Sequence, residues 1–211
     1  MYLSKLKRKS NKLVNGLCLF SAFSLSACNS VQAQDLSKLP LSDILKQEYV
    51  GETPQQSSQY DFFIGEWDIF LTEYDKSGKV KDTAKGVWWA KYIHDKRVVY
   101  DDVVLFDGKG KLHAGYPSLR TFSKKLGKWV SMHMAPLATQ ALCSNVGTWE
   151  NNEMRIDAVC RKTDGTIQGY SRVRFYNITD NSFDYTWEDS QDQKNWTLYV
   201  TFEGKRRIIA Q

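Results

Sequence analysis

Histidine and cysteine are scarce in this 211-residue sequence, and the motifs that organise many enzyme active sites are missing. The three histidines, His94, His113 and His133, have no metal-ligand spacing, and no His-Glu-x-x-His or paired Cys-x-x-Cys motif occurs. No glycine-rich phosphate loop follows a strand-like segment, and no Gly-x-Ser-x-Gly motif is present. The sequence therefore gives no sign of a zinc hydrolase, a nucleotide-binding loop or a serine hydrolase, and we expect no metal site.

Net positive charge is also missing from most of the chain. The formal charge of +5 comes from five lysine and arginine residues before residue 28, where no aspartate or glutamate occurs. The remainder is formally neutral, because +5 minus these five charges is zero. A domain without net positive charge lacks the electrostatic footprint that nucleic-acid binding requires, so we expect no nucleic-acid partner.

Residues 1–27 have the composition of an export signal, with a basic start and an apolar run from Leu13 to Ala27. This run is short for a permanent membrane-spanning helix. It ends in Leu25-Ser26-Ala27-Cys28, which resembles the lipobox of bacterial lipoproteins. The resemblance implies lipidation of Cys28 and, because Asn29 follows instead of aspartate, an outer-membrane anchor. Cleavage after Val31-Gln32-Ala33, with release into the periplasm, is the alternative.

Residues 28–59 are expected to form a tether between the anchor and the folded domain. Ser42 to Tyr49 has the pattern of a short helix that Ser42 caps and Gly51 ends. Glu52 to Gln59 is polar and is interpreted as a linker. We place the folded domain at residues 60–211.

Strand-like runs rich in aromatic and β-branched residues alternate with turn residues from Asp61 onward. The pattern predicts about ten strands, each paired with the next, without space for crossover helices. A long antiparallel sheet tends to close and so remove its edges. We therefore expect an all-β, antiparallel up-and-down barrel; the alternative is a β-sandwich, which needs longer connections. The expected turns are Ser77-Gly78, Asp95-Lys96, Gly108-Lys109, Lys124–Gly127, Asn151-Asn152, Asp164-Gly165, Asp180-Asn181 and Gln191–Lys194.

Only Cys143 and Cys160 remain after Cys28, and in an oxidising envelope such a pair predicts one disulfide. A two-residue turn at Asn151-Asn152 places these cysteines directly opposite each other. The separation at a non-hydrogen-bonded pair, about 4.5 Å between Cα atoms, is within disulfide reach.

Gly65-x-Trp67 resembles the Gly-x-Trp element that opens the barrel of lipocalins and other calycins. In that superfamily the tryptophan closes the barrel floor beneath a basic residue of the last strand. Here the resemblance implies Arg206 for that role, since Arg206 shares strand alternation with Val200 and Phe202. A cation over an indole ring contributes about 0.5–2 kcal/mol. The predicted floor residues are therefore Gly65, Trp67 and Arg206.

Two narrower resemblances involve the same opening. Asp61-Phe62-x-x-Gly65-x-Trp67, together with Ser118–Phe122 and Trp129, is similar to bacterial secreted proteins of unknown function, which implies a fold and no reaction. The chain also resembles the haem-binding nitrobindins, but a further glycine after Trp67 is missing. We therefore expect no cofactor, with haem as a minor alternative.

Alternation from Trp67 through successive hairpins predicts the cavity wall. The expected pairs include Trp67 with Trp88, Asp101 with Tyr116, and Arg120 with Ser131. A bulge near Gly115–Pro117 would reverse the later strands and turn a rival apolar face inward, formed by Leu119, Val130, Met132 and Met134. Without that bulge, the predicted ligand-binding residues are Trp88, Tyr92, Asp101, Tyr116, Arg120, Trp129, Ser131 and His133.

An aromatic wall with a few polar groups is typical of a small-molecule site. Arg120 is a candidate to bind a ligand carboxylate, but pairing with Asp101 inside the barrel is the commoner fate of buried charges and is the favoured interpretation. We expect an envelope-anchored protein that binds a small amphipathic or aromatic ligand. The alternatives are an isomerase or hydratase that uses Asp101 and His133 as acid and base, and an interaction module with an exposed apolar patch and no ligand.

Overall fold

The computed structural model describes residues 51–134, 142–162 and 164–208. The helix expected at residues 42–49, the lipobox with Cys28 and the alternative cleavage site at Ala33 lie outside these residues. Within them, no helix is both long enough and apolar enough to cross a lipid bilayer.

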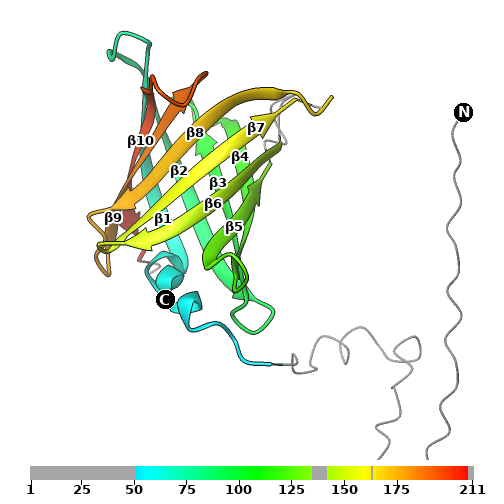
Figure 1. The fold of residues 1–211 in the computed structure, drawn as a ribbon. Helices are drawn as coiled ribbons and strands as arrows, with labels where there is room; N and C mark the ends of the chain where they lie inside the picture. The colour runs from blue at the N-terminus through cyan, green and yellow to red at the C-terminus, as the bar shows by residue number, and fades with distance from the viewer. Residues whose placement is uncertain (1–50, 135–141, 163, 209–211) are drawn as a thin grey trace, which may run out of the picture. The chain divides into compact units, whose positions relative to one another are not determined.

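The described residues form one closed antiparallel barrel of ten strands (Figure 1). Each strand pairs with the next along the chain, and β10 pairs with β1. The closed sheet confirms the predicted architecture and excludes the sandwich. The strands are β1 (Gly65–Tyr74), β2 (Val80–Ile93), β3 (Val98–Phe106), β4 (Leu112–Ser123), β5 (Lys128–His133), β6 (Leu142–Glu150), β7 (Glu153–Arg161), β8 (Ile167–Tyr176), β9 (Ser182–Ser190) and β10 (Thr197–Arg206).

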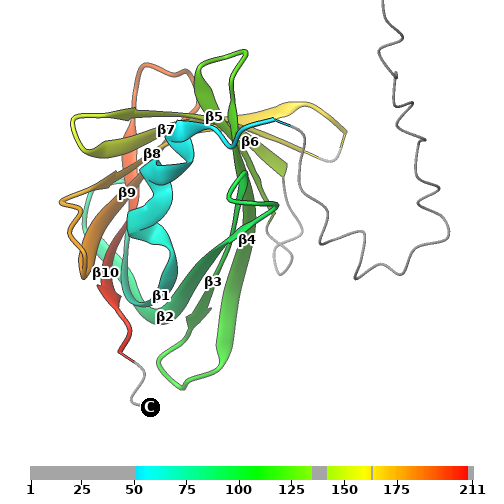
Figure 2. The ribbon, with the colours of Figure 1, turned by 90° about the horizontal axis from the view of Figure 1, so that it is seen from below.

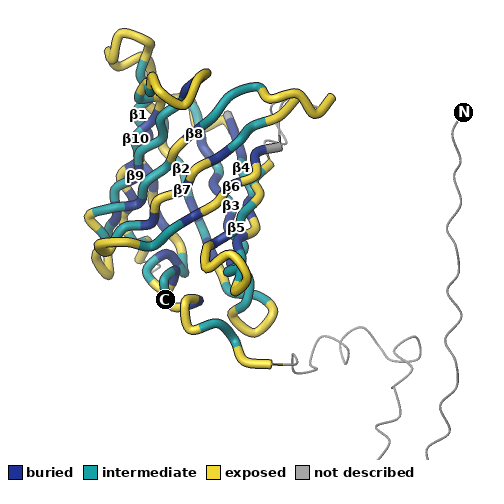
Figure 3. The backbone as a smooth tube through the Cα atoms, in the orientation of Figure 1, coloured by how far each residue is buried: buried dark blue, intermediate teal, exposed yellow. Residues whose placement is uncertain are grey.

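Burial alternates along the strands, as expected for a sheet with one face inside the barrel (Figure 3). In β3 every second residue is buried, including Val99, Asp101, Val103 and Leu105. No register shift occurs in the β3–β4 pairing near Gly115–Pro117. Strands β4 and β5 therefore keep the predicted phase.

The β6–β7 hairpin has the register that its turn predicted. Asn151 and Asn152 have φ values of 53° and 59°, as both central residues of a type I′ turn require. Cys143 lies opposite Cys160, and the two form a disulfide with a Cα–Cα distance of 4.1 Å. The turn residues alone therefore determined which cysteine positions face each other.

The β3–β4 hairpin differs from the prediction by two residues. Asp107 closes a longer loop, because its carboxylate accepts hydrogen bonds from the backbone N–H groups of Lys109 and Lys111. Together with a register shift between Leu105 and Phe106, this loop moves the pairing by two residues, so Asp101 faces Ser118 and Val103 faces Tyr116, and the expected pairing of Asp101 with Tyr116 is wrong. A shift of two residues preserves the direction of each side chain, and the inward set is therefore unchanged.

The segment before β1 corrects two predictions. Residues Gln55–Phe63 form a 3₁₀ helix, η2, whereas we expected a linker to Gln59 and a strand from Asp61. Its buried residues, Ser57, Tyr60 and Phe63, are three apart, which matches the three residues per turn of a 3₁₀ helix. The helix lies across one end of the barrel (Figure 2), and Gly65, at φ 123°, then turns the chain into β1.

Trp67 and Arg206 join this helix to the barrel. Trp67 is fully buried and donates a 2.8 Å hydrogen bond from Nε1 to the carbonyl of Phe63. The Arg206 guanidinium lies 4.2 Å from the Trp67 ring centre and donates to the carbonyls of Phe62 and Ile64. The contact implied by the Gly-x-Trp resemblance is therefore present, and it links the last strand to η2.

Candidate functional site

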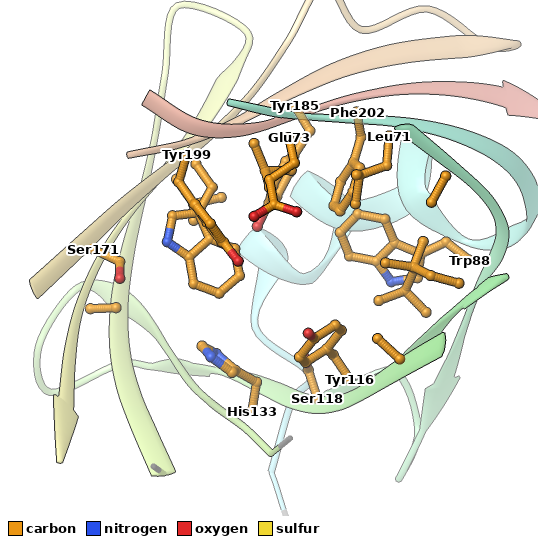
Figure 4. Close-up of a pocket in the computed structure, with 18 of the residues that line it drawn as sticks. Leu71, Glu73, Trp88, Tyr116, Ser118, His133, Ser171, Tyr185, Tyr199 and Phe202 are labelled. Carbon is orange, nitrogen blue, oxygen red and sulfur yellow. The ribbon is translucent and has the colours of Figure 1, made fainter. Parts of the chain in front are cut away.

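A cavity of about 180 Å³ occupies the barrel interior. It lies beyond the aromatic floor, which we define as Tyr60 and Phe63 of η2 together with Trp67. Its wall includes apolar side chains from several strands, and Asp107 and Gly108 of the β3–β4 loop lie at its edge. The polar side chains His133, Ser118, Ser171 and Glu73 also face it (Figure 4). Other wall residues in the figure are Leu71, Trp88, Tyr116, Tyr185, Tyr199 and Phe202.

Four of the predicted ligand-binding residues line this cavity: Trp88, Tyr116, Arg120 and His133. The other four, Tyr92, Asp101, Trp129 and Ser131, are not among its lining residues.

Tyr92 and Trp129 contact the floor helix. The Tyr92 hydroxyl lies 2.6 Å from the carbonyl of Ser57, to which it donates. Trp129 donates from Nε1 to the side-chain oxygen of Gln59 at 2.9 Å, and it packs edge-on against Tyr60. The unforeseen helix η2 therefore occupies the end of the barrel where the ligand was expected to contact these two aromatic residues.

Arg120 and Asp101 form a buried ion pair, with side chains 7% and 0% exposed. Arg120 Nε lies 2.7 Å from Asp101 Oδ2, and Nη2 lies 3.0 Å from Oδ1. Trp88 Nε1 also donates to Oδ1 at 3.0 Å. The Nε–Nη2 edge of the guanidinium is thus engaged within the protein, which matches the internal-pair alternative.

His133 and Asn145 form a second polar cluster on the wall. Their Nδ1 and Nδ2 atoms lie 3.1 Å apart. Asn145 is only 7% exposed, and its Oδ1 has no hydrogen-bond partner among the described residues. Exchanging the amide oxygen and nitrogen would still leave one buried polar atom unpaired. A buried polar atom is costly without a partner, and Asn145 lies in the cavity wall beside His133.

His133 should make the protein less stable in acid. Burial, and secondarily the Arg120 charge, lowers the pKa of His133 from 6.5 to about 4. Below pH 6.5 the unfolded chain therefore binds a proton that the folded protein excludes until about pH 4. We expect unfolding free energy to fall through this interval by up to roughly 3 kcal/mol.

Urea unfolding of the disulfide-bonded protein between pH 7 and pH 4 would measure this loss. The variant His133→Gln should show a smaller decrease across the same interval, because glutamine does not titrate. Equal pH dependence of the two proteins would contradict the assignment.

Sequence reasoning missed several wall residues. Glu73 continues the inward alternation of Trp67 and Leu71, and this signal was available from the sequence. Its carboxylate lies 2.6 Å from Lys81 Nζ. Tyr199 gave no such signal, because a register shift between Leu198 and Val200 interrupts the alternation.

The outer surface of β4–β6 carries a partly exposed apolar strip. Leu119 and Met132 pair across β4 and β5 and are 46% and 49% exposed. Met134 and Val146 extend it, at 50% and 38% exposure. The interaction-module hypothesis predicted such a patch instead of a cavity, whereas the structure contains both.

The residues around the cavity do not fit haem. Its volume of about 180 Å³ is below the roughly 300–1,000 Å³ typical of drug-sized sites, and a haem macrocycle with two propionates is itself a large ligand. The Arg120 charge is also already paired with Asp101, which weakens its attraction for a propionate. We therefore derive no function through haem.

Comparisons with known proteins establish similarity at the level of the fold. No protein-family model matches the sequence, and no curated protein matches it. The crystal structure of Rv2717c from M. tuberculosis is similar with a TM-score of 0.59 and 7% identity, covering 74% of this chain and 100% of that chain. A protein of unknown function from the DUF3598 family of Nostoc punctiforme aligns at a TM-score of 0.21 and 7% identity, covering 73% and 100% of the respective chains. The likeness to Rv2717c, at so low an identity, concerns the barrel architecture alone.

Proposed function

We propose that this protein is an envelope-anchored, lipocalin-like binding protein for one small, largely apolar ligand. The observation that carries the proposal is the cavity, which combines an aromatic wall with the polar side chains of His133, Ser118 and Ser171. A mostly apolar pocket with a few polar groups is the usual form of a small-molecule site. The lipobox-like sequence ending at Cys28 supports the location at the envelope.

The cavity volume limits the size of the ligand. An engineered cavity of about 150 Å³ in another protein binds benzene, and the volume here is about 180 Å³. The expected occupant is therefore on the order of one substituted aromatic ring. Trp88, Tyr116 and Phe202 offer ring faces or edges against which such a ligand would pack.

The wall favours a neutral ligand over the carboxylate that the sequence suggested. Arg120 is already neutralised by Asp101. The Glu73 carboxylate also faces the cavity (Figure 4), but it is paired with Lys81, so neither ion pair of the wall offers an unpaired positive charge to an anionic ligand. A phenol or alcohol, by contrast, can hydrogen bond to His133 or Ser118 in the cavity wall without bringing a charge into the barrel.

The enzyme alternative receives no support from this geometry. Asp101 accepts hydrogen bonds from Arg120 and Trp88 and does not line the cavity. A carboxylate held in this way is poorly placed to exchange a proton with a substrate beside His133. Binding without chemistry is therefore the function that we propose.

Filling the cavity should prevent binding. Ala158 and Val159 are neighbours in β7, but Ala158 is buried at the cavity wall whereas Val159 is on the alternate face. We expect 4-ethylphenol to quench tryptophan fluorescence saturably in the unmodified protein. Ala158→Phe should weaken this binding at least tenfold, and Val159→Phe should leave it nearly unchanged.

The isosteric anion 4-ethylbenzoate tests the predicted polarity, because it should bind more weakly than the phenol. Near-ultraviolet circular dichroism would verify that both variants remain folded. Absence of saturable binding by a panel of neutral single-ring compounds, or equal affinity in the two folded variants, would refute the proposed cavity function.

A further inference from the structure

Three potential metal ligands meet at one level of the barrel wall, on the adjacent strands β5, β6 and β7. His133 lies opposite Cys143, and Cys143 lies opposite Cys160. One imidazole nitrogen and the two sulfur atoms all lie within 4.8 Å of one another. A disulfide that only links two strands does not require a neighbouring histidine, so the presence of His133 distinguishes this cluster from a purely structural disulfide.

We propose that reduction of the Cys143–Cys160 disulfide creates a binding site for a thiolate-preferring metal ion, represented by Zn²⁺. This inference concerns the disulfide cluster and does not depend on the proposed ligand. Imidazole and thiolate are the common protein ligands of zinc. In the oxidised protein the disulfide sulfurs are not thiolates, and the site is therefore latent.

The distances suit a tetrahedral ion after small side-chain movements. Zn–S bonds of about 2.3 Å and Zn–N bonds of about 2.0 Å place tetrahedral ligand atoms roughly 3.3–3.8 Å apart. The imidazole must approach the sulfurs by about 1.5 Å at most, given the present limit of 4.8 Å. The sulfurs must separate after reduction, which rotation about their Cα–Cβ bonds permits.

Neighbouring residues affect the orientation of the His133 ring and the access of an ion to the cluster. Asn145 lies against His133 Nδ1; with its amide turned so that Oδ1 accepts from Nδ1–H, it would orient the ring as acceptors beside metal-binding histidines commonly do. His133 also lines the cavity, so an ion at this cluster would be reachable from it. Among the described residues, no further histidine, cysteine, aspartate or glutamate provides a fourth ligand to the cluster. A water or a small thiol would therefore complete a tetrahedral set.

The reaction balances with a dithiol as the reductant. The dithiol supplies two electrons and two protons, becomes a disulfide itself, and converts the Cys143–Cys160 bond into two thiols. Zn²⁺ then forms two Zn–S bonds and releases the two thiol protons, without change of oxidation state. Metal binding should consequently be stronger at higher pH.

Metal titration of the reduced full chain tests the inference. After reduction with dithiothreitol and its removal under argon, Co²⁺ should bind at one equivalent and show thiolate charge-transfer and tetrahedral visible bands. Zn²⁺ should displace it. The oxidised protein should show neither band, because its sulfurs remain covalently joined.

Substitutions separate this site from other ligands in the chain. His133→Ala should weaken Co²⁺ binding at least tenfold, whereas His94→Ala, at the β2–β3 turn, should not change it. The double variant Cys143→Ser/Cys160→Ser should lose the charge-transfer band although it retains Cys18 and Cys28.

Circular dichroism and thermal unfolding address the stability of the reduced protein. Zn²⁺ should raise the melting temperature of the reduced chain and leave that of the oxidised chain unchanged. The inference is overturned if the folded reduced protein binds no metal, if both histidine variants behave alike, or if reduction unfolds the chain and Zn²⁺ does not restore it.

Discussion

Replacing Asp101 with alanine should lower the free energy of unfolding by about 3–5 kcal/mol, because it leaves the Arg120 charge buried without a partner. Arg120 is 7% exposed, and both of its contacts to the carboxylate are direct hydrogen bonds. The substitution also removes the acceptor for Trp88 Nε1. Urea unfolding followed by tryptophan fluorescence would measure the loss.

An exposed ion pair of the same chemistry provides the matched control. Arg172 donates to both carboxylate oxygens of Glu188, but these side chains are 44% and 30% exposed. Glu188→Ala should therefore cost less than about 1 kcal/mol. The double variant Asp101→Leu/Arg120→Met should recover much of the stability lost in Asp101→Ala, because it removes both charges. Similar losses in Asp101→Ala and Glu188→Ala would show that burial of the pair has no special effect.

Phe63→Ala should destabilise the barrel by about 3–5 kcal/mol, the range for a large aromatic residue removed from a core. Phe63 is 0% exposed and lies at the centre of the floor. Its ring contacts Trp88 edge-on at 5.0 Å between ring centres, and Phe175 at 5.4 Å. Alanine would leave a cavity that the surrounding strands, held in a closed sheet, can only partly fill.

Phe70→Ala is a suitable comparison, since Phe70 is on β1 but 41% exposed on the outer face. It should cost less than about 1 kcal/mol. Chemical unfolding of both variants under identical conditions gives the difference directly. If Phe63→Ala were as mild as Phe70→Ala, the helix η2 would not contribute a stabilising plug to the barrel.

The predictions that succeeded depend on local geometry. Asn151 and Asn152 accept the positive φ values of a tight hairpin turn, and this turn determines that Cys143 faces Cys160. Strand alternation likewise placed Trp88, Arg120 and His133 inside the barrel. Even the wrong turn between β3 and β4 did not change the inward set, because the error was two residues.

The predictions that failed involve contacts between distant parts of the chain. The segment Gln55–Phe63 is polar at its start and has no strong helical periodicity in sequence, yet it forms the floor. Its end is held by Arg206 of the last strand, which is distant in the sequence and donates to the carbonyls of Phe62 and Ile64, and by the nearby Trp67, which donates to the carbonyl of Phe63. No local pattern indicates that such a segment covers a barrel end.

The sequence by itself determined the strand order, the inward face and the cysteine pairing, because turns and two-residue alternation act over a few neighbouring residues. Only the tertiary structure decided how the interior is divided. Helix η2 fills one end with aromatic rings, and Asp101 neutralises Arg120 across β3 and β4. Both outcomes depend on packing and charge pairing between segments that meet only after the sheet has closed.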